Sequence, residues 1–279
     1  MKVNDVEICV DTLGSPGDPA VLLIAGSASS MDWWADGFRE RLAAAGRYVI
    51  RYDLRDTGQS ESYPPGQPGY TFKDLIADAV GVLDALGVAS AQVVGVSMGG
   101  ALAQIMAVQH PDRVNSLVLI ATSRASGPSD GELPGMSADL RMFFENHPAP
   151  DYADRDAMIE NTVTVMRQFE GARYFDESAV RETAGRVFDR TRDMASSEQN
   201  HMKMPATEDA PVELSAIVAP TLILHGTADP LFPIAHGEAL ARAIPHASLL
   251  PLDGVGHQPP PAATWDIVVP RMLALAEAG

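Results

Sequence analysis

Several features are scarce in this chain of 279 residues. Its one cysteine, Cys9, can form no disulfide within the chain, so nothing here depends on an oxidising compartment. No apolar run reaches the 18 or more residues of a membrane span, and the nearest is Ala20–Gly26. The first residues are acidic before any apolar run develops, unlike a secretory signal. We therefore expect a cytoplasmic protein with no membrane partner.

Basic side chains are also few, with 20 Lys and Arg against 37 Asp and Glu and a net charge of −17. That charge repels phosphate backbones, so we expect no nucleic-acid partner. The seven histidines are scattered and lack metal-binding spacing, so we expect no metal. The segment G-V-S-M-G-G lacks the G-x-G-x-x-G spacing of a dinucleotide site, and we expect no cofactor.

What the chain does have is an alternation of short apolar runs with amphipathic helical stretches. Apolar side chains at helical spacing lie between Thr71, a candidate N-cap, and Gly87, a candidate stop. The alternation predicts a mostly parallel sheet with helices on both faces. The candidate strands are Val21–Ala25, Tyr48–Asp53, Gln92–Val96, Ser116–Ala121, Thr221–His225 and Ala247–Leu252.

The alternation stops between about Arg124 and Pro220, where helical patterns replace the apolar runs. We expect an α/β core formed by residues 1–123 and 213–279, with a helical cap over 124–212 inserted after the sixth strand. Seven of the twelve methionines fall in this insertion. Methionine suits a cavity wall that adapts to a ligand, and it equally suits gaps between cap helices, so both interpretations stay open.

The strongest motif is Gly95-Val96-Ser97-Met98-Gly99, between a predicted strand and a predicted helix. A serine at such a tight turn needs small neighbours two residues away on either side, which are glycines here. The turn places the Ser97 hydroxyl at a helix N-terminus, where developing negative charge is stabilised. We predict that Ser97 is a nucleophile.

A serine nucleophile needs a base, and the base needs a carboxylate to orient it. Asp229 follows a predicted strand in His225-Gly226-Thr227-Ala228-Asp229, and His257 follows the last predicted strand among small residues. We therefore predict Ser97, His257 and Asp229 as a catalytic triad. Asp253, four residues before His257, is the alternative acid.

Together these motifs resemble the α/β-hydrolase fold superfamily from about Val21 to His257, and the resemblance implies a mostly parallel core sheet of about eight strands. The segment Arg51–Ser60 is similar to the D-x-R-G-x-G-x-S stretch of that superfamily, with Asp56 where glycine is usual. Its R-Y-D-x-R-D-T-G form and the Met-rich insertion look like the bacterial serine esterases related to aclacinomycin methylesterase. The resemblance implies Ser97 as nucleophile, His257 as base and Asp229 as acid.

The resemblance also implies an oxyanion hole made by the backbone amides of Ser27 and Met98. Ala25 stands where the family usually has a histidine that braces this loop, which leaves the loop's support to be found. For the substrate pocket we predict a set of large apolar side chains and one histidine, although the tryptophans equally suit core packing and the histidine a solvated loop. These residues are Trp33, Trp34, Met142, Phe143, Met166 and His201.

Three functions fit these residues. The first is a serine carboxylic ester hydrolase that acts through an acyl-enzyme on a bulky apolar ester, with a methyl ester implied by the resemblance. The second is a C–C bond hydrolase or a cofactor-free perhydrolase that uses the same triad. The third is a non-catalytic ligand-binding protein with this fold. The expected partner is a small-molecule ester, and the sequence leaves homodimer formation open.

Overall fold

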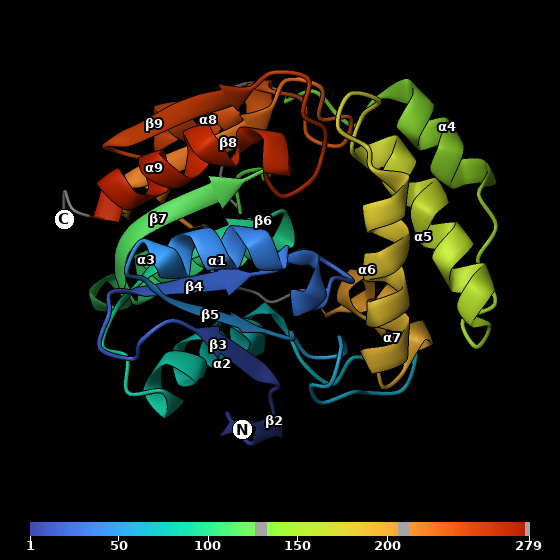
Figure 1. Ribbon diagram of the computed structural model, residues 1–279, viewed down its shortest axis with the longest axis horizontal. Coiled ribbons are helices and arrows are strands. Elements are labelled where there is room, and N and C mark those ends of the chain that lie inside the picture. The colour runs from blue at the N-terminus through green and yellow to red at the C-terminus, as the bar shows by residue number, and fades with distance from the viewer. Residues whose placement is uncertain (126–132, 206–211, 277–279) are drawn as a thin grey trace.

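The centre of the computed structural model, which describes residues 1–125, 133–205 and 212–276, is a seven-stranded sheet (Figure 1). The strand order is β3-β5-β4-β6-β7-β8-β9, and β3 is antiparallel to β5 while the other pairs are parallel. The six predicted strands all form, to within two residues at either end. The strands are β3 (Val10–Leu13), β4 (Ala20–Ile24), β5 (Tyr48–Tyr52), β6 (Ala91–Val96), β7 (Val114–Ile120), β8 (Thr221–Gly226) and β9 (Ala247–Leu252).

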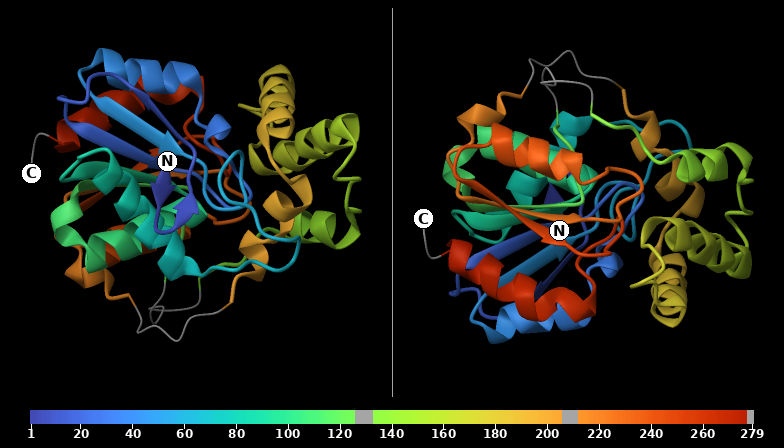
Figure 2. Two further views of the ribbon diagram at one scale, coloured as in Figure 1. Left: turned by 90° about the horizontal axis from the view of Figure 1, so that it is seen from below. Right: turned by 90° about the horizontal axis from the view of Figure 1, so that it is seen from above.

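Helices cover both faces of this sheet, which explains why its central strands are apolar at most positions. In β4, Leu22 and Ile24 belong to the core under one face, whereas Val21 and Leu23 belong to the core under the other. Helices α2, α3 and α8 pack on the first face, and α1 and α9 pack on the second (Figures 1 and 2). These helices are α1 (Asp36–Ala44), α2 (Phe72–Ala85), α3 (Met98–Gln109), α8 (Ala235–Ala243) and α9 (Trp265–Ala276).

The predicted ends of α2 are confirmed. The Thr71 hydroxyl and the Asp74 carboxylate form a capping box at its start, and Gly87 after its end has a φ of +69°. The α/β class is likewise confirmed, but the strand count of the main sheet is seven instead of about eight. The first residues form a separate hairpin, β1 (Lys2–Val3) and β2 (Val6–Glu7). Asn4 and Asp5 turn this hairpin with positive φ angles, so its strands pair with each other and not with the sheet.

Among the described residues, four α-helices lie between β7 and β8 in the chain, and they form a layer beside the carboxyl ends of the parallel strands (Figures 1 and 2). They follow β7, the fifth strand of the main sheet in chain order, instead of a sixth. We call this set the cap helices. They are α4 (Ala138–Asn146), α5 (Arg155–Phe169), α6 (Glu177–Arg190) and α7 (Met194–Gln199), followed by the short turn η3 (His201–Lys203).

In the described ranges, no helix combines the length and apolar character needed to cross a bilayer.

Candidate active site

Ser97 lies at the turn between β6 and α3, in strained backbone geometry with φ 53° and ψ −118°. The turn is tight enough to require glycine on both sides. A Cβ on Gly95 would lie 2.1 Å from the carbonyl oxygen of Gly99, and a Cβ on Gly99 would lie 2.4 Å from that of Ile24. The strain is held by neighbouring strands, because the Ser97 amide donates to the Ile120 carbonyl at 3.0 Å. The hydroxyl therefore stands at the carboxyl edge of the sheet.

Two side chains from distant segments meet this hydroxyl in the predicted order. His257 Nε2 lies 3.0 Å from Ser97 Oγ, and His257 Nδ1 lies 2.9 Å from Asp229 Oδ2. The other carboxylate oxygen of Asp229 accepts hydrogen bonds from the amides of Leu231 and Phe232 at 2.9 and 2.8 Å. The Asp229 side chain is fully buried and that of His257 is 10% exposed. The geometry is that of a nucleophile, a base and an orienting acid.

Aromatic rings and the end of a cap helix hold the imidazole of His257 in place. The rings of Phe169 and Phe232 each lie 5.5 Å from the His257 ring, centroid to centroid. The backbone amide of His257 donates to the Phe169 carbonyl at 2.7 Å, at the last residue of α5. Gly256 permits this approach, since a Cβ there would lie 2.1 Å from the same oxygen. The base is thus positioned by a cap helix as well as by the sheet.

The alternative acid is not in contact with this histidine. Asp253 is exposed and forms an ion pair with Arg173 at 2.5 Å. His225, whose Nε2 lies 3.7 Å from Asp229 Oδ2, donates instead to the Phe232 carbonyl at 2.7 Å. Burial lowers the pKa of His225, which favours its neutral form. Asp229 is therefore the carboxylate that pairs with His257.

The two backbone amides proposed for the oxyanion hole are not used in other hydrogen bonds among the described residues. Met98 is the first residue of α3, and within the described residues neither its amide nor that of Ser27 donates to another group. A Cβ on Gly26, which precedes Ser27, would lie 3.4 Å from the Ser97 Cβ. The loop therefore passes directly beside the hydroxyl, and both amides stay available to a bound oxygen.

Ser97 and His257 lie at the wall of a cavity of about 660 Å³ between the sheet edge and the cap helices. Its lining is mainly apolar, and three of the six predicted pocket residues belong to it, namely Trp33, Trp34 and Met166. Other apolar residues also line it, and two of them, Met158 and Met194, are among the insertion methionines that were considered for a cavity wall. They include Phe144, Met158, Val165, Phe169, Val187, Phe188 and Met194.

The other three predicted pocket residues do not line the cavity. Met142 is 56% exposed, and Phe143 stacks on His147 with ring centroids 4.5 Å apart. The neighbouring Phe144 takes the pocket position, because one residue along a helix turns the side chain by about 100°. His201 is buried and bonded at both ring nitrogens to the backbone of the core, so it neither lines the cavity nor lies in a solvated loop.

Two carboxyl groups line this apolar cavity, and no sequence motif pointed to either. Glu170 follows α5 and Glu198 lies in α7. Burial raises the pKa of each to about 7, and nearby Asp176 adds to the effect at Glu170. Neither carboxyl has a hydrogen-bond partner among the described residues, and the described lining includes no Lys or Arg. The cavity therefore offers carboxyl groups and no cation to its ligand.

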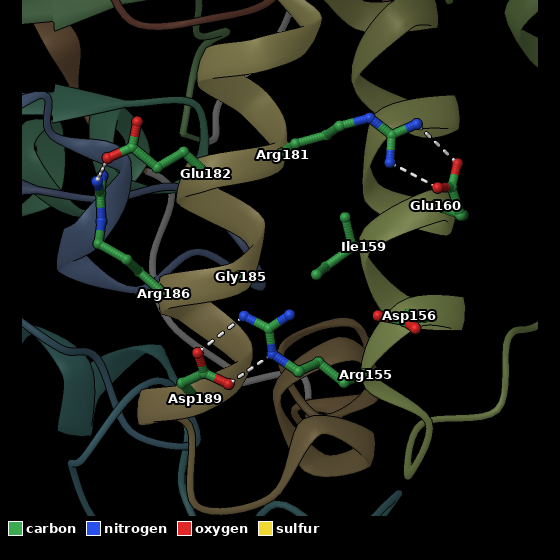
Figure 3. Close-up of a pocket in the computed structure, with 9 residues that line it drawn as sticks. All are labelled: Arg155, Asp156, Ile159, Glu160, Arg181, Glu182, Gly185, Arg186 and Asp189. Atoms are coloured by element: carbon green, nitrogen blue, oxygen red, sulfur yellow. Dashed lines mark hydrogen bonds and ion pairs between the residues drawn. The ribbon is translucent and has the colours of Figure 1, made fainter.

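A second hollow, of about 700 Å³, lies between α5 and α6 and has a different character (Figure 3). Its basic side chains pair with acids drawn in the same view: Arg155 with Asp189, Arg181 with Glu160, and Arg186 with Glu182. Their charges are already matched within this hollow, and it contains none of the triad residues. The candidate active site is therefore the apolar cavity, where Ser97 and His257 lie.

Comparison with known proteins agrees with this geometry. The family described as alpha/beta hydrolase fold matches residues 19–259, which is most of the chain. The protein therefore belongs to the α/β-hydrolase fold family.

Individual proteins of known name are also similar to this chain. The chain is 31% identical to rhodomycin D methylesterase DauP of Streptomyces sp. (strain C5), over 92% of this chain and 91% of the relative. It is 30% identical to 2-hydroxymuconate semialdehyde hydrolase of Pseudomonas putida, over 94% and 89% respectively. Among solved structures, esterase RhEst1 from Rhodococcus sp. ECU1013 superimposes with a TM-score of 0.77 at 20% identity, covering 99% of this chain and 98% of that one. This last likeness shows the fold alone.

Proposed function

We propose that the protein is a serine hydrolase that cleaves a carboxylic ester, with a methyl ester as the expected substrate and methanol as the leaving group. The observation that carries the proposal is the contact series from Ser97 Oγ to His257 Nε2 and from His257 Nδ1 to Asp229, at the wall of an apolar cavity. The likeness to a methylesterase over nine-tenths of the chain supports the choice of bond. In this proposal the cap helices form the wall that receives the apolar acyl part.

The reaction follows from the positions of these groups. His257 takes the Ser97 proton as Ser97 Oγ attacks the ester carbonyl, and Asp229 stabilises the imidazolium that forms. The amides of Ser27 and Met98 donate to the oxyanion, and His257 returns the proton to the leaving methanol. Water, deprotonated by His257, then attacks the acyl-enzyme, and Ser97 leaves with the proton. A fixed relay and two free amides are sufficient for both halves of the reaction.

The cavity favours a neutral or cationic ester over a carboxylate substrate. The carboxyls of Glu170 and Glu198 line it, and the described lining has no Lys or Arg to neutralise an anion. The relative from Pseudomonas putida is named for a muconate semialdehyde, a carboxylate, and this charge pattern argues against such a C–C bond substrate here.

The proposal is tested first at the nucleophile. Ser97→Ala should lower the kcat for methyl and p-nitrophenyl esters by about 10⁴-fold or more, since the relay loses its nucleophile. Ser123→Ala is the control, because Ser123 Oγ bonds His236 at 2.7 Å and does not touch the triad. A fluorophosphonate should label wild type and not Ser97→Ala. Retention of most turnover in Ser97→Ala would rule out the mechanism, and failure to label wild type would favour a ligand-binding protein.

The substrate preference is tested with matched methyl esters whose acyl parts carry an amine, an isosteric alkyl group or a carboxylate. At pH 8, where both wall carboxyls are mostly ionised, we expect kcat/KM to be about 10-fold or more lower for the carboxylate than for the alkyl ester. Glu198→Gln should reduce that difference, because it removes one negative charge from the wall. A ring-cleavage dione is assayed beside the esters. Turnover of the dione with no ester turnover would show that the C–C bond assignment is correct.

A further inference from the structure

The loop that carries Ser27 is supported by a side chain from the cap segment. The amide of Ala28 donates to His201 Nδ1 at 3.0 Å, and His201 Nε2 lies 2.9 Å from the Arg55 carbonyl. His201 is 5% exposed, and its segment is 173 residues from Ala28 in the chain. We propose that His201 is a positioning residue for the oxyanion hole, and that it supplies from the cap the support that Ala25 cannot give.

The two contacts fix one form of the ring. Because the Ala28 amide can only donate, His201 Nδ1 must be the acceptor and carry no proton. The remaining ring proton is then on Nε2, where it donates to the Arg55 carbonyl. Protonation of Nδ1 would set two N–H groups against each other, and burial lowers the pKa of His201, which favours the neutral ring. The imidazole thus links two backbone groups of the core.

This link holds the peptide unit next to the proposed oxyanion donor. Ala28 has a φ of +54°, a left-handed conformation that needs support in a residue with a Cβ. The N–H of the Ser27–Ala28 peptide is bonded to His201, and its C=O accepts from Ser29 Oγ at 3.1 Å. With this peptide held at both ends, rotation about Ser27 is restricted. The amide of Ser27 is thereby held in one direction beside the Ser97 hydroxyl.

The ring is itself held by its neighbours. Asn200 donates to Asp56 Oδ2 at 2.9 Å and accepts from the Gly66 amide at 2.6 Å. Tyr70 donates to the same Asp56 oxygen at 2.7 Å, and its ring meets the His201 ring edge-on at 6.2 Å. The segment is therefore attached to the loop after β5 independently of the oxyanion loop. A support fixed in this way can set the position of Ala28 instead of following it.

The experiment compares His201→Leu with His201→Asn. Leucine removes the acceptor for the Ala28 amide, whereas the Asn carboxamide oxygen can stand near the position of Nδ1. We expect His201→Leu to lower kcat by about 10- to 100-fold with KM little changed, since a misplaced oxyanion donor acts in the transition state. Affinity for a boronic acid that forms a tetrahedral adduct on Ser97 should fall in parallel. His201→Asn should recover most of both losses.

His236 provides a matched control. It is 7% exposed, its ring nitrogens contact Ser123 Oγ at 2.7 Å and the Pro134 carbonyl at 2.8 Å, and it does not touch the oxyanion loop. His236→Leu should lower thermal stability and leave kcat per active site, counted by fluorophosphonate titration, within about 3-fold of wild type. An equal loss of kcat in His236→Leu and His201→Leu would overturn the proposal, as would a rise in KM alone.

Two further measurements keep the test decisive. If His201→Leu does not fold, His201→Ala is assayed with and without free imidazole, which should restore kcat by refilling the position. Absence of rescue by imidazole, with His201→Asn no better than His201→Ala, overturns the proposal. The inference rests on the proposed function, so the rate of Ser97 labelling by a fluorophosphonate is also measured. If wild type labels but cleaves no ester, the ester assignment fails, while a slow label in His201→Leu would still support the role of His201.

Discussion

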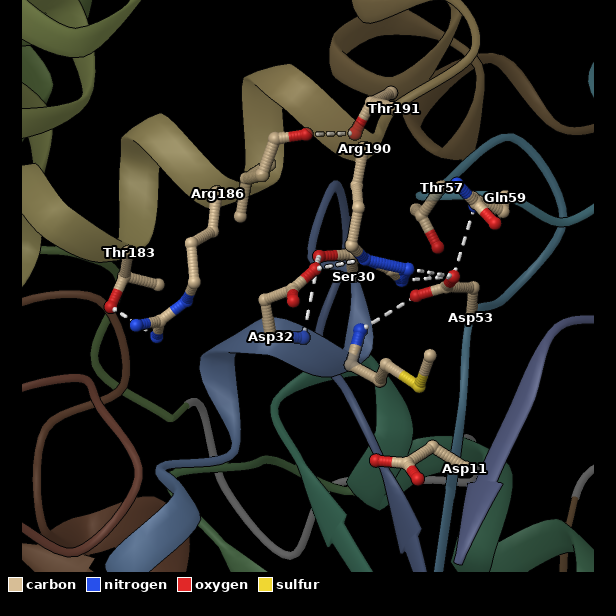
Figure 4. A network of polar contacts seen from close by, with 12 residues as sticks. Asp11, Ser30, Asp32, Asp53, Thr57, Gln59, Thr183, Arg186, Arg190 and Thr191 are labelled. Atoms are coloured by element: carbon tan, nitrogen blue, oxygen red, sulfur yellow. Dashed lines mark hydrogen bonds and ion pairs between the residues drawn. The ribbon is translucent and has the colours of Figure 1, made fainter.

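The interactions that stabilise the sheet differ in kind from those that attach the cap helices to it. The sheet lies between two large apolar clusters, one under each face, whereas the buried apolar cluster within the described cap consists of Met158, Val187 and Met194. Polar groups attach the cap to the core, beside a few apolar contacts such as that of Trp33 with this cap cluster. Among the polar contacts are those of Arg190 with Asp53 and Asp32, which Figure 4 shows from close by.

Apolar burial and polar contacts therefore have different roles: the first stabilises the sheet, and the second sets the position of the cap. Apolar burial is strong and non-directional, so it stabilises the sheet without fixing a cap on its edge. Hydrogen bonds and ion pairs have defined geometry, so they place the ends of α5, α6 and α7 against particular backbone groups of the core. Two of these contacts, at His257 and at Ala28, lie in the candidate site. The cap is therefore part of the site's positioning as well as its wall.

The largest expected effect on stability comes from truncating a buried apolar side chain, which we compare between the sheet and the cap. Leu119→Ala in β7 should lower the free energy of unfolding by about 3 to 4 kcal/mol, because Leu119 is fully buried in the close-packed core. Met158→Ala in α5 should cost about 2 kcal/mol, because Met158 is buried but borders a cavity that already exists, so its loss opens no new closed void. Urea unfolding followed by circular dichroism measures both. Equal losses would show that the cap is packed as tightly as the sheet.

The next prediction removes a polar contact between the cap and the core. Arg190→Gln should cost about 3 kcal/mol, because Arg190 binds Asp53 at 2.5 Å and Asp53 is fully buried. Faster proteolysis of the cap than of the sheet would locate the loss at the joint between the layers. Arg186→Gln, one turn earlier on α6, is the control, since its partner Glu182 is exposed and the change should stay below about 0.5 kcal/mol. Similar values for the two variants would mean that Arg190 does not attach the cap.

The sequence was sufficient for the six parallel strands because each of them carries its own signal. The antiparallel edge strand β3 was missed, because Asp11 and Thr12 interrupt any apolar run in its four residues. Continuous apolar runs predict strands buried on both faces, and Gly95 and Gly99 predict the turn at Ser97 from local geometry alone. The triad could be predicted because its members follow strand ends that meet at one edge. Contacts of the cap carry no such local signal, which is why the prediction named Phe143 as a pocket residue where the structure has Phe144.

The role of His201 shows the same limit more clearly. Its neighbours Met202 and Met204 indicated a pocket, yet its ring bonds the backbone of Ala28 and Arg55, groups that every residue possesses. Bonds to backbone leave no pattern in the side chains of the partner segment. Such contacts can be found only once the cap has been placed on the sheet.

The smallest expected effect is on the pH dependence of stability at Glu170, where the cap meets the core. The Glu170 carbonyl accepts from the Gly256 amide and from Gln258, while burial raises the pKa of its carboxyl from 4.5 to about 7. Between pH 4.5 and 7 the folded protein therefore holds a proton that the unfolded chain has released, so this group lowers stability as pH rises. Glu170→Gln should leave the free energy of unfolding unchanged at pH 4 and raise it by about 2 kcal/mol at pH 6. Glu145→Gln, on the exposed side of α4, should change neither value. Denaturant unfolding of both variants at the two pH values decides the point, and a gain for Glu170→Gln of the same size at pH 4 would show that its ionisation is not the cause.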